Sequence, residues 1–210
     1  MNRELLEICI VKSARQPFKW IAVIAALGLP LIAEAHPGHA GVALLDGFLH
    51  PWLGWDHLLA MLAVGLWARQ QASGTALRPL ARLPALFVAA VAFGALAGRQ
   101  LGGGGLVEAL IASSLIGLGA LLAVSRTLPF AIAAAITLPM GLVHGWAHGA
   151  EMAADAPMLP FFAGFMLATA ALHLCGIGLA ALALNRGGGL LIRASGLGFA
   201  ALGCGLLVGG

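Results

Sequence analysis

Charged side chains are what this sequence has least of. Only 9% of its 210 residues are Asp, Glu, Lys or Arg, and tyrosine is absent. A soluble domain carries about 25% charged residues, so this chain lacks the polar side chains needed to solvate a surface of its own. Because 61% of the residues are hydrophobic, the composition indicates an integral membrane protein instead.

Cysteine is also scarce, and the net charge is small. Cys9 lies near the start, while Cys175 and Cys204 lie inside apolar runs. We therefore expect small buried apolar residues rather than a disulfide framework. The formal charge of +3 does not indicate a nucleic-acid partner, because lysine and arginine report topology in a membrane protein.

The N-terminal region has the features of a secretory signal peptide. Its first 19 residues are basic, an apolar run "WIAVIAALGLPLIA" follows, and "AEA" comes directly before "HPGH". The run of about 14 residues is shorter than the roughly 20 that a membrane span needs. We predict a signal peptide over residues 1–35, cleaved after Ala35. An uncleaved anchor helix and a later start, such as one at Val11, stay open.

Six apolar runs of spanning length follow His36 and predict a membrane domain over residues 36–210. Lipid allows the backbone only helices or a closed barrel, and continuous rather than alternating apolar runs argue against a barrel. The fold class predicted is therefore an all-α integral membrane protein with six transmembrane helices. The expected spans are residues 44–68, 80–98, 103–124, 128–148, 158–184 and 190–208.

Arginine predicts the orientation of these spans. The loops after the first, third and fifth spans hold six arginines, whereas the other side holds only Arg99. The positive-inside rule places the six in the cytoplasm, so the mature N-terminus would be periplasmic and the protein would lie in a bacterial inner membrane. The six are Arg69, Arg78, Arg82, Arg126, Arg186 and Arg193.

Histidines and acids gather in or at the edges of the predicted spans. An Asp, Lys or Arg at the centre of a span costs about 2.5–3.5 kcal/mol on insertion scales, and no intramembrane lysine or arginine is present to pair with the acids. The compensating positive charge would have to come from protons or a metal cation. The residues concerned are Asp56, His57, Glu108, His144, His148, Glu151 and His173.

Spacing makes a metal ion the sharper hypothesis. In "HGWAHGAE", His144 and His148 are four residues apart and share a helix face, with Glu151 three residues further on. Two imidazoles and a carboxylate on adjacent turns form half of a transition-metal site. In "HPWLGWDH", His57 directly follows an aspartate, and His50 lies two turns earlier. Both motifs would lie near the outer membrane face.

Several of these residues also have a structural interpretation. Pro51 makes the start of the first span irregular, so His50 either caps the helix or lies in a loop that folds over the site. Asp56 either binds metal or orients an imidazole. Glu108 and His173 are predicted to lie on a path for the ion from the outer site toward the cytoplasm. The alternatives are contact with interfacial water for Glu108 and a hydrogen bond across helices for His173.

The "HPGH" segment would become the mature N-terminus if the signal peptide is cleaved. A free amine and the imidazole of His36 can chelate a metal together, and His39 could join them. The functional hypothesis is a flexible arm that captures metal, and the alternative is an untethered polar terminus.

The motifs resemble those of the HupE/UreJ family of nickel/cobalt permeases over about residues 36–208. The resemblance rests on "HPGH", "GFLHPWLGWDHLLAMLAVGLWA", "HGWAHGAE" and "GFMLATAALHLCGIG". It implies uptake of Ni²⁺ or Co²⁺ as substrate, with no resident cofactor. It also implies a metal-binding role for the motif residues, which are His36, His39, His50, Asp56, His57, His144, His148 and Glu151.

We therefore expect a permease rather than an enzyme, with Ni²⁺ the first choice of metal and Co²⁺ the next. Two alternatives stay open, an intramembrane metalloenzyme and a metal-holding assembly partner of a hydrogenase or urease system. The sequence lacks a His-Glu-x-x-His zinc motif, because Gly145 and Trp146 follow His144. The expected partners are the metal ion and the lipid bilayer, and the sequence leaves open whether the chain forms a homo-oligomer.

Overall fold

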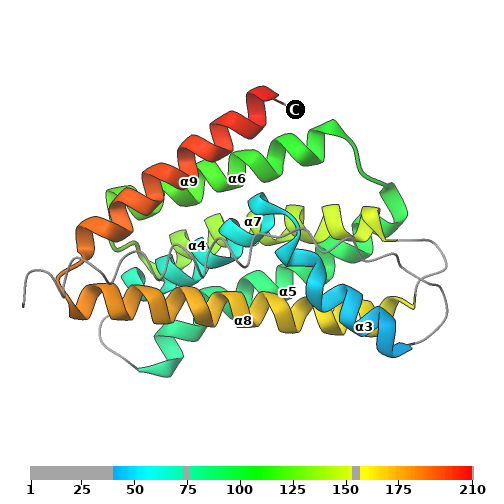
Figure 1. Ribbon diagram of the computed structural model, residues 1–210, viewed down its shortest axis with the longest axis horizontal. Helices are drawn as coiled ribbons and strands as arrows, with labels where there is room; N and C mark the ends of the chain where they lie inside the picture. Colours follow the sequence, from blue (N-terminus) through cyan, green and yellow to red (C-terminus); the bar gives the residue numbers. More distant parts are fainter. Residues whose placement is uncertain (1–39, 73–75, 153–156, 210) are drawn as a thin grey trace, which may run out of the picture. The chain divides into compact units, whose positions relative to one another are not determined.

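The computed structural model describes residues 40–72, 76–152 and 157–209, and all regular structure in these residues is helical. This confirms the all-α prediction for that part of the chain (Figure 1). The predicted signal peptide, His36 and His39 lie outside the described residues. The elements are α3 (Ala40–Leu49), η1 (His50–Trp52), α4 (Trp55–Gln71), α5 (Leu77–Leu101), α6 (Gly105–Val124), α7 (Phe130–Glu151), α8 (Met158–Asn185) and α9 (Gly189–Gly209).

Five of the described helices are long and apolar enough to cross a membrane. They correspond to the second to sixth predicted spans, and they characterise the chain as a multi-pass membrane protein. Large apolar side chains such as Phe93, Leu159 and Leu190 are exposed on them, as expected of helices that face lipid. The five segments are Arg78–Leu101, Gly105–Val124, Phe130–Glu151, Met158–Asn185 and Gly189–Gly209.

The first predicted span, residues 44–68, is not one helix, and this part of the prediction is wrong. The chain forms the 10-residue α3, a single 3₁₀ turn and the 17-residue α4. Pro51 has no backbone N–H to donate to a helix that continues from α3. Gly54 has an extended backbone (φ −102°, ψ 120°) and starts α4 in a new direction.

Both halves of this broken helix pack along α8. Gly47 of α3 lies on the backbone of Phe161, whereas Gly65 of α4 lies against Gly176, further along α8. The contact therefore advances along α8 as the chain passes from α3 into α4. Consequently residues 50–54, which connect α3 to α4, lie alongside α8 rather than beyond its end.

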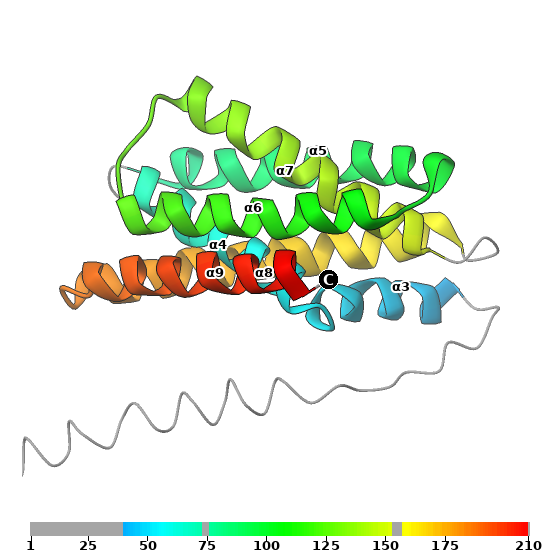
Figure 2. The ribbon, with the colours of Figure 1, turned by 90° about the horizontal axis from the view of Figure 1, so that it is seen from above.

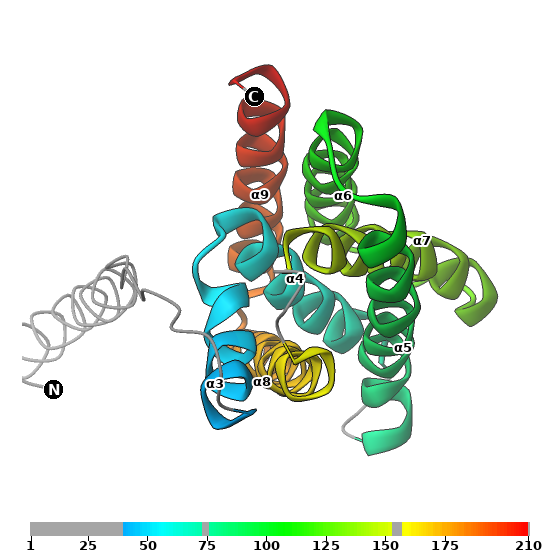
Figure 3. The ribbon, with the colours of Figure 1, turned by 90° about the vertical axis from the view of Figure 1, so that its right-hand side faces the viewer.

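Helix α4 forms the centre of the described bundle. Seen end-on, it lies among α5, α7, α8 and α9 (Figure 3), and it contacts α5, α6, α8 and α9. Met61, Val64 and Trp67 are at most 1% exposed, so α4 is apolar on several faces, as buried membrane helices are.

Helices α5 and α7 run parallel at backbone contact. Gly145 and Gly149 of α7 lie against the carbonyl groups of Val91 and Ala95 of α5, where an added Cβ would overlap the carbonyl oxygen. Small residues permit such close approach between membrane helices. Because each of these glycines directly follows a histidine in "HGWAHGAE", this contact fixes how α7 presents its histidines.

The two ends of the bundle carry different residues, and Figure 2 shows the arrangement of the helices from above. We call the end where α5 ends at Leu101 and α7 ends at Glu151 the histidine end. We call the opposite end, where α4 ends at Gln71 and α6 ends at Val124, the arginine end. The loops predicted to share one side do meet at the arginine end, since Gln71 Nε2 donates to the carbonyl of Arg126 at 2.8 Å.

Candidate metal site at the histidine end

Helix α7 supplies two buried imidazoles and one partly exposed carboxylate. His144 and His148 are both 0% exposed, and they share a face as the four-residue spacing predicts. Glu151, the last residue of α7, keeps 44% of its side chain exposed. His144 Nδ1 donates to the Met140 carbonyl at 2.9 Å, which leaves Nε2 as the nitrogen with a free lone pair.

The broken helix brings the second motif to the same place. His50 lies in η1, and its Nε2 is 3.0 Å from Glu151 Oε2, although the two residues are 101 positions apart in the chain. The carboxylate can only accept, so this hydrogen bond requires the proton on Nε2 of His50. Because η1 turns the chain at this point, His50 lies in a turn over the site rather than on a continuous helix.

Three of these residues form a group with the dimensions of a metal site. One ligand atom from each of His50, His148 and Glu151 lies within 4.8 Å of the other two. The Nδ1 of His148 is 3.5 Å from Oε2 of Glu151. Two imidazoles and a carboxylate are donors that bind divalent transition metals. The site therefore has three converging ligands from two distant segments of the chain.

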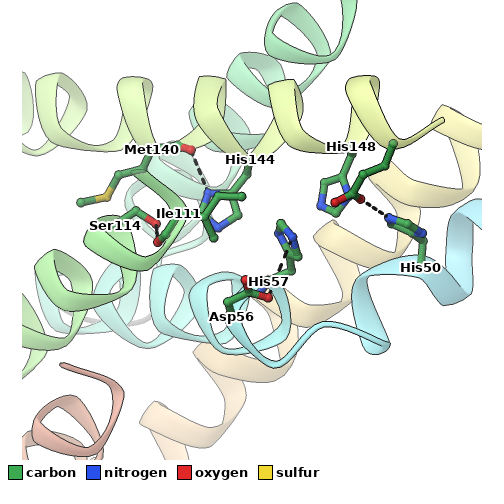
Figure 4. A network of polar contacts seen from close by, with 9 residues as sticks. His50, Asp56, His57, Ile111, Ser114, Met140, His144 and His148 are labelled. Atoms are coloured by element: carbon green, nitrogen blue, oxygen red, sulfur yellow. Dashed lines mark hydrogen bonds and ion pairs between the residues drawn. The ribbon is translucent and has the colours of Figure 1, made fainter. Parts of the chain in front are cut away.

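A column of imidazole rings continues from this group into the bundle. The ring centroids of His50 and His148 are 4.8 Å apart, and those of His148 and His57 are 4.1 Å apart. The next step, from His57 to His144, is 5.3 Å. Figure 4 shows these rings from α7, α4 and η1 facing a common space. Consecutive rings are thus in contact with one another.

Asp56 lies beside this column. Its Oδ1 accepts the backbone N–H of His57 at 2.8 Å and is 3.9 Å from His57 Nε2. The side chain of Asp56 keeps 22% exposure. This position fits either of the two predicted roles, a metal ligand or an acid that orients an imidazole.

The buried nitrogens of this column lack hydrogen-bond partners among the described residues. The atoms are His57 Nδ1, His144 Nε2 and His148 Nε2, while His148 Nδ1 has only the 3.5 Å contact with Glu151; both ring nitrogens of the neighbouring His173 also lack a partner. A buried polar group without a partner costs roughly 2–7 kcal/mol, depending on the reference state. Several unpaired imidazole nitrogens buried close together therefore destabilise the fold unless they bind something. Neutral imidazole is a common ligand of metal ions.

The other two predicted path residues differ in position. His173 of α8 is 1% exposed and contacts Phe87, with ring centroids 5.2 Å apart. Glu108 lies in the first turn of α6 and is exposed. None of the described hydrogen bonds or ion pairs joins Glu108 to the imidazole column. His173, in contrast, lies close to the inner end of the column.

Aromatic side chains around the imidazoles were not predicted from the sequence. The Phe165 ring lies 4.2 Å from the His148 ring, and the Phe161 ring lies 5.6 Å from the His50 ring. Both phenylalanines belong to α8 and are four residues apart, so they share a face. That spacing is visible in the sequence, but an aromatic pair in an apolar helix is also typical of ordinary core packing.

Two comparisons with known proteins found a match for this chain. The model of the family described as HupE / UreJ protein matches residues 24–206. The chain belongs to the HupE/UreJ family. It is similar to Protein HupE of Rhizobium leguminosarum bv. viciae, with 38% identity over 191 residues, which cover 91% of this chain and 98% of that protein. No solved structure matches the chain.

The family match confirms the resemblance inferred from the motifs. Residues 24–206 include α3 to α8 and nearly all of α9. Every described residue of the imidazole column therefore lies inside the segment that identifies the chain as a HupE/UreJ member.

Proposed function

We propose that this protein is an inner-membrane permease that takes up a divalent transition metal, Ni²⁺ first and Co²⁺ next, from the periplasm. One observation carries the proposal, the convergence of His50, His148 and Glu151 at the head of a column of imidazoles. The family membership supports the same function, because the motifs on which the resemblance rests supply these ligands.

Capture of the ion begins where the site is open to solvent. His50 and Glu151 keep 30% and 44% side-chain exposure, whereas His148 behind them has none. A metal ion can bind His50 through Nε2 only after the proton on that nitrogen has moved to Nδ1 or has been released. Capture therefore breaks the hydrogen bond between His50 and Glu151, and the freed carboxylate offsets part of the charge of the ion.

Passage needs ligands that bind the ion without trapping it. His57 and His144 offer neutral nitrogens, and Asp56 is the acid beside them. The membrane potential supplies about 2.3 kcal/mol per charge per 100 mV, hence about 4.6 kcal/mol for a divalent ion. Facilitated entry therefore needs no hydrolysis of ATP by this chain.

The choice of metal does not follow from the donor atoms alone. Zn²⁺ and Cu²⁺ bind imidazole and carboxylate as well as or better than Ni²⁺ and Co²⁺. Selectivity would depend on geometry, and the rings of Phe161 and Phe165 restrict how His50 and His148 can move.

The topology that we propose has six crossings, with α3, η1 and α4 together forming the first. The arginine end faces the cytoplasm by the positive-inside rule, so the histidine end faces the periplasm. A signal peptide over residues 1–35 would place His36 and His39 on that same side, as a capture arm. Glu108, near the start of α6, would lie at the periplasmic surface and attract cations toward the site.

The test is uptake of radiolabelled nickel by proteoliposomes that contain only this protein and carry an imposed potential, negative inside. We expect uptake that saturates with nickel and increases with the potential. Protein that binds nickel but accumulates none in the vesicles would overturn the permease and favour a metal-holding assembly partner.

A further inference from the structure

His173 is a deeply buried polar side chain in the middle of α8. It lies 15 residues after Met158, is 1% exposed, and has no hydrogen-bond partner at either ring nitrogen among the described residues. Thr169, one turn earlier and also buried, donates its hydroxyl to its own helix at 2.9 Å. The Thr169 hydroxyl thus has a hydrogen-bond partner within α8, whereas neither ring nitrogen of His173 has one among the described residues.

Phe87 of α5 links His173 to the imidazole column. The Phe87 ring is 0% exposed and lies 5.5 Å from the His144 ring and 5.2 Å from the His173 ring. His173 is therefore the next imidazole after His144, and both imidazoles contact the same aromatic ring. The crossing of α4 and α8 holds it there, because Gly65 lies directly against the backbone of His173.

The surroundings of His173 differ from those of the outer group. Glu151 is adjacent to His50 and His148, whereas none of the hydrogen bonds and ion pairs among the described residues joins His173 to a carboxylate. Beyond it, toward the arginine end, the buried core includes apolar residues such as Trp67 and Leu122. An ion at His173 would thus have less negative charge around it and would be held more weakly than at the outer group.

We propose that His173 is an inner station on the metal path, which accepts the ion from His144 and is needed for passage but not for capture. This inference rests on the proposed permease function. The ion is first held by the exposed, charged outer group and then by a buried neutral imidazole. A neutral imidazole holds the ion weakly enough for it to leave, and the membrane potential drives it on toward the arginine end.

The experiment compares nickel binding with nickel transport in His173→Ala. Binding is measured by equilibrium dialysis of the purified protein in lipid nanodiscs, and transport by the proteoliposome assay. We expect the dissociation constant to stay within about twofold of wild type. The maximal uptake rate should fall by about tenfold or more, which corresponds to about 1.4 kcal/mol or more.

Three further variants make the outcome specific. Thr169→Val, on the same helix and equally buried, should retain both binding and transport. His148→Ala should lose both, because it removes a ligand of the outer group. His173→Gln keeps a polar side chain, and it should show the same loss of rate with unchanged binding if the alanine variant does not fold.

The results separate this inference from the function itself. Normal transport by His173→Ala or His173→Gln, with transport lost in His148→Ala, would overturn the inner station and leave the permease standing. Loss of nickel binding in a folded His173 variant would also overturn it, because capture and passage would then share one site. Wild-type protein that transports no nickel would instead contradict the proposed function.

Discussion

The loop between α6 and α7 at the arginine end and the imidazole column at the histidine end use polar side chains in opposite ways. At the arginine end, Gln71 donates to the carbonyl of Arg126 and accepts from the N–H of Leu128 at 2.7 Å. These bonds tie the end of α4 to the loop between α6 and α7. At the histidine end, Nε2 of His148 and Nδ1 of His57 have no such partner among the described residues.

The polar groups of Gln71 are paired and stabilise the fold, whereas the imidazole nitrogens are buried without a hydrogen-bond partner among the described residues. A hydrogen bond inside a protein contributes about 0.5–1.5 kcal/mol net, whereas a buried polar group left without a partner costs about 1–3 kcal/mol. Under the proposed function, the histidine end gives up stability to keep lone pairs accessible to an ion.

The largest effect should come from removing the ring at the centre of the column. His148→Ala, and equally His57→Ala, should reduce nickel uptake to background, because each ring contacts its neighbours on both sides. The measurement is uptake at matched protein levels in the membrane. The control is Thr137→Val, a buried position in α7 whose hydroxyl donates to its own helix. Near-normal uptake by either histidine variant would refute the shared column.

Acid should affect the histidine end and leave the arginine end unchanged. Metal binding needs neutral imidazole, and the unperturbed pKa of histidine is about 6.5. Uptake at a clamped potential should therefore fall as the external pH is lowered from about 7.5 to about 5, through that reference value.

The shape of this pH profile discriminates between mechanisms. Uptake that rises steadily toward acid would mean that protons drive transport as co-substrates, and facilitated entry would have to be abandoned. A flat profile would mean that the histidines do not bind the ion in the rate-limiting step. Retained secondary structure by circular dichroism at the lowest pH is the control for unfolding.

A smaller effect should follow from moving α7 without changing any ligand. In Gly145→Ala the new methyl group meets the Val91 carbonyl, so α7 must shift away from α5 and displace His144 and His148. We expect partial loss of uptake and a destabilisation of about 1–3 kcal/mol. Gly198→Ala, where the added carbon meets nothing within 4 Å, is the matched control. Equal behaviour of the two variants would show that the close packing of α5 and α7 does not position the site.

The smallest effect on metal handling should come from the arginine end. Gln71→Ala removes two hydrogen bonds to the loop between α6 and α7, and it should lower stability by about 1–3 kcal/mol. The dissociation constant for nickel should not change. The measurement is thermal unfolding beside nickel dialysis on the same preparation. Weaker nickel binding with unchanged melting would contradict the division between the two ends.

Local patterns in the sequence predicted much of the described fold, and long-range contacts explain what they missed. The apolar runs predicted all five candidate spans, and the spacing of His144 and His148 predicted their shared face. The pairing of His50 with Glu151 joins residues 101 positions apart, and no local pattern encodes it. The division of the first span into two helices was missed for a similar reason, since an apolar run shows burial and not direction. Pro51 did mark the irregularity, and a loop that places His50 over the site was one of the two predicted alternatives.

X-ray absorption spectroscopy of nickel bound to the purified protein examines the proposed three-ligand group without relying on transport. If His50, His148 and Glu151 hold the ion, the spectrum should show at least the two imidazoles of this group together with oxygen ligands. His148→Ala should lose imidazole scattering, whereas Thr137→Val should match wild type. A spectrum with oxygen ligands alone, or one that is unchanged in His148→Ala, would contradict binding of the metal at this group.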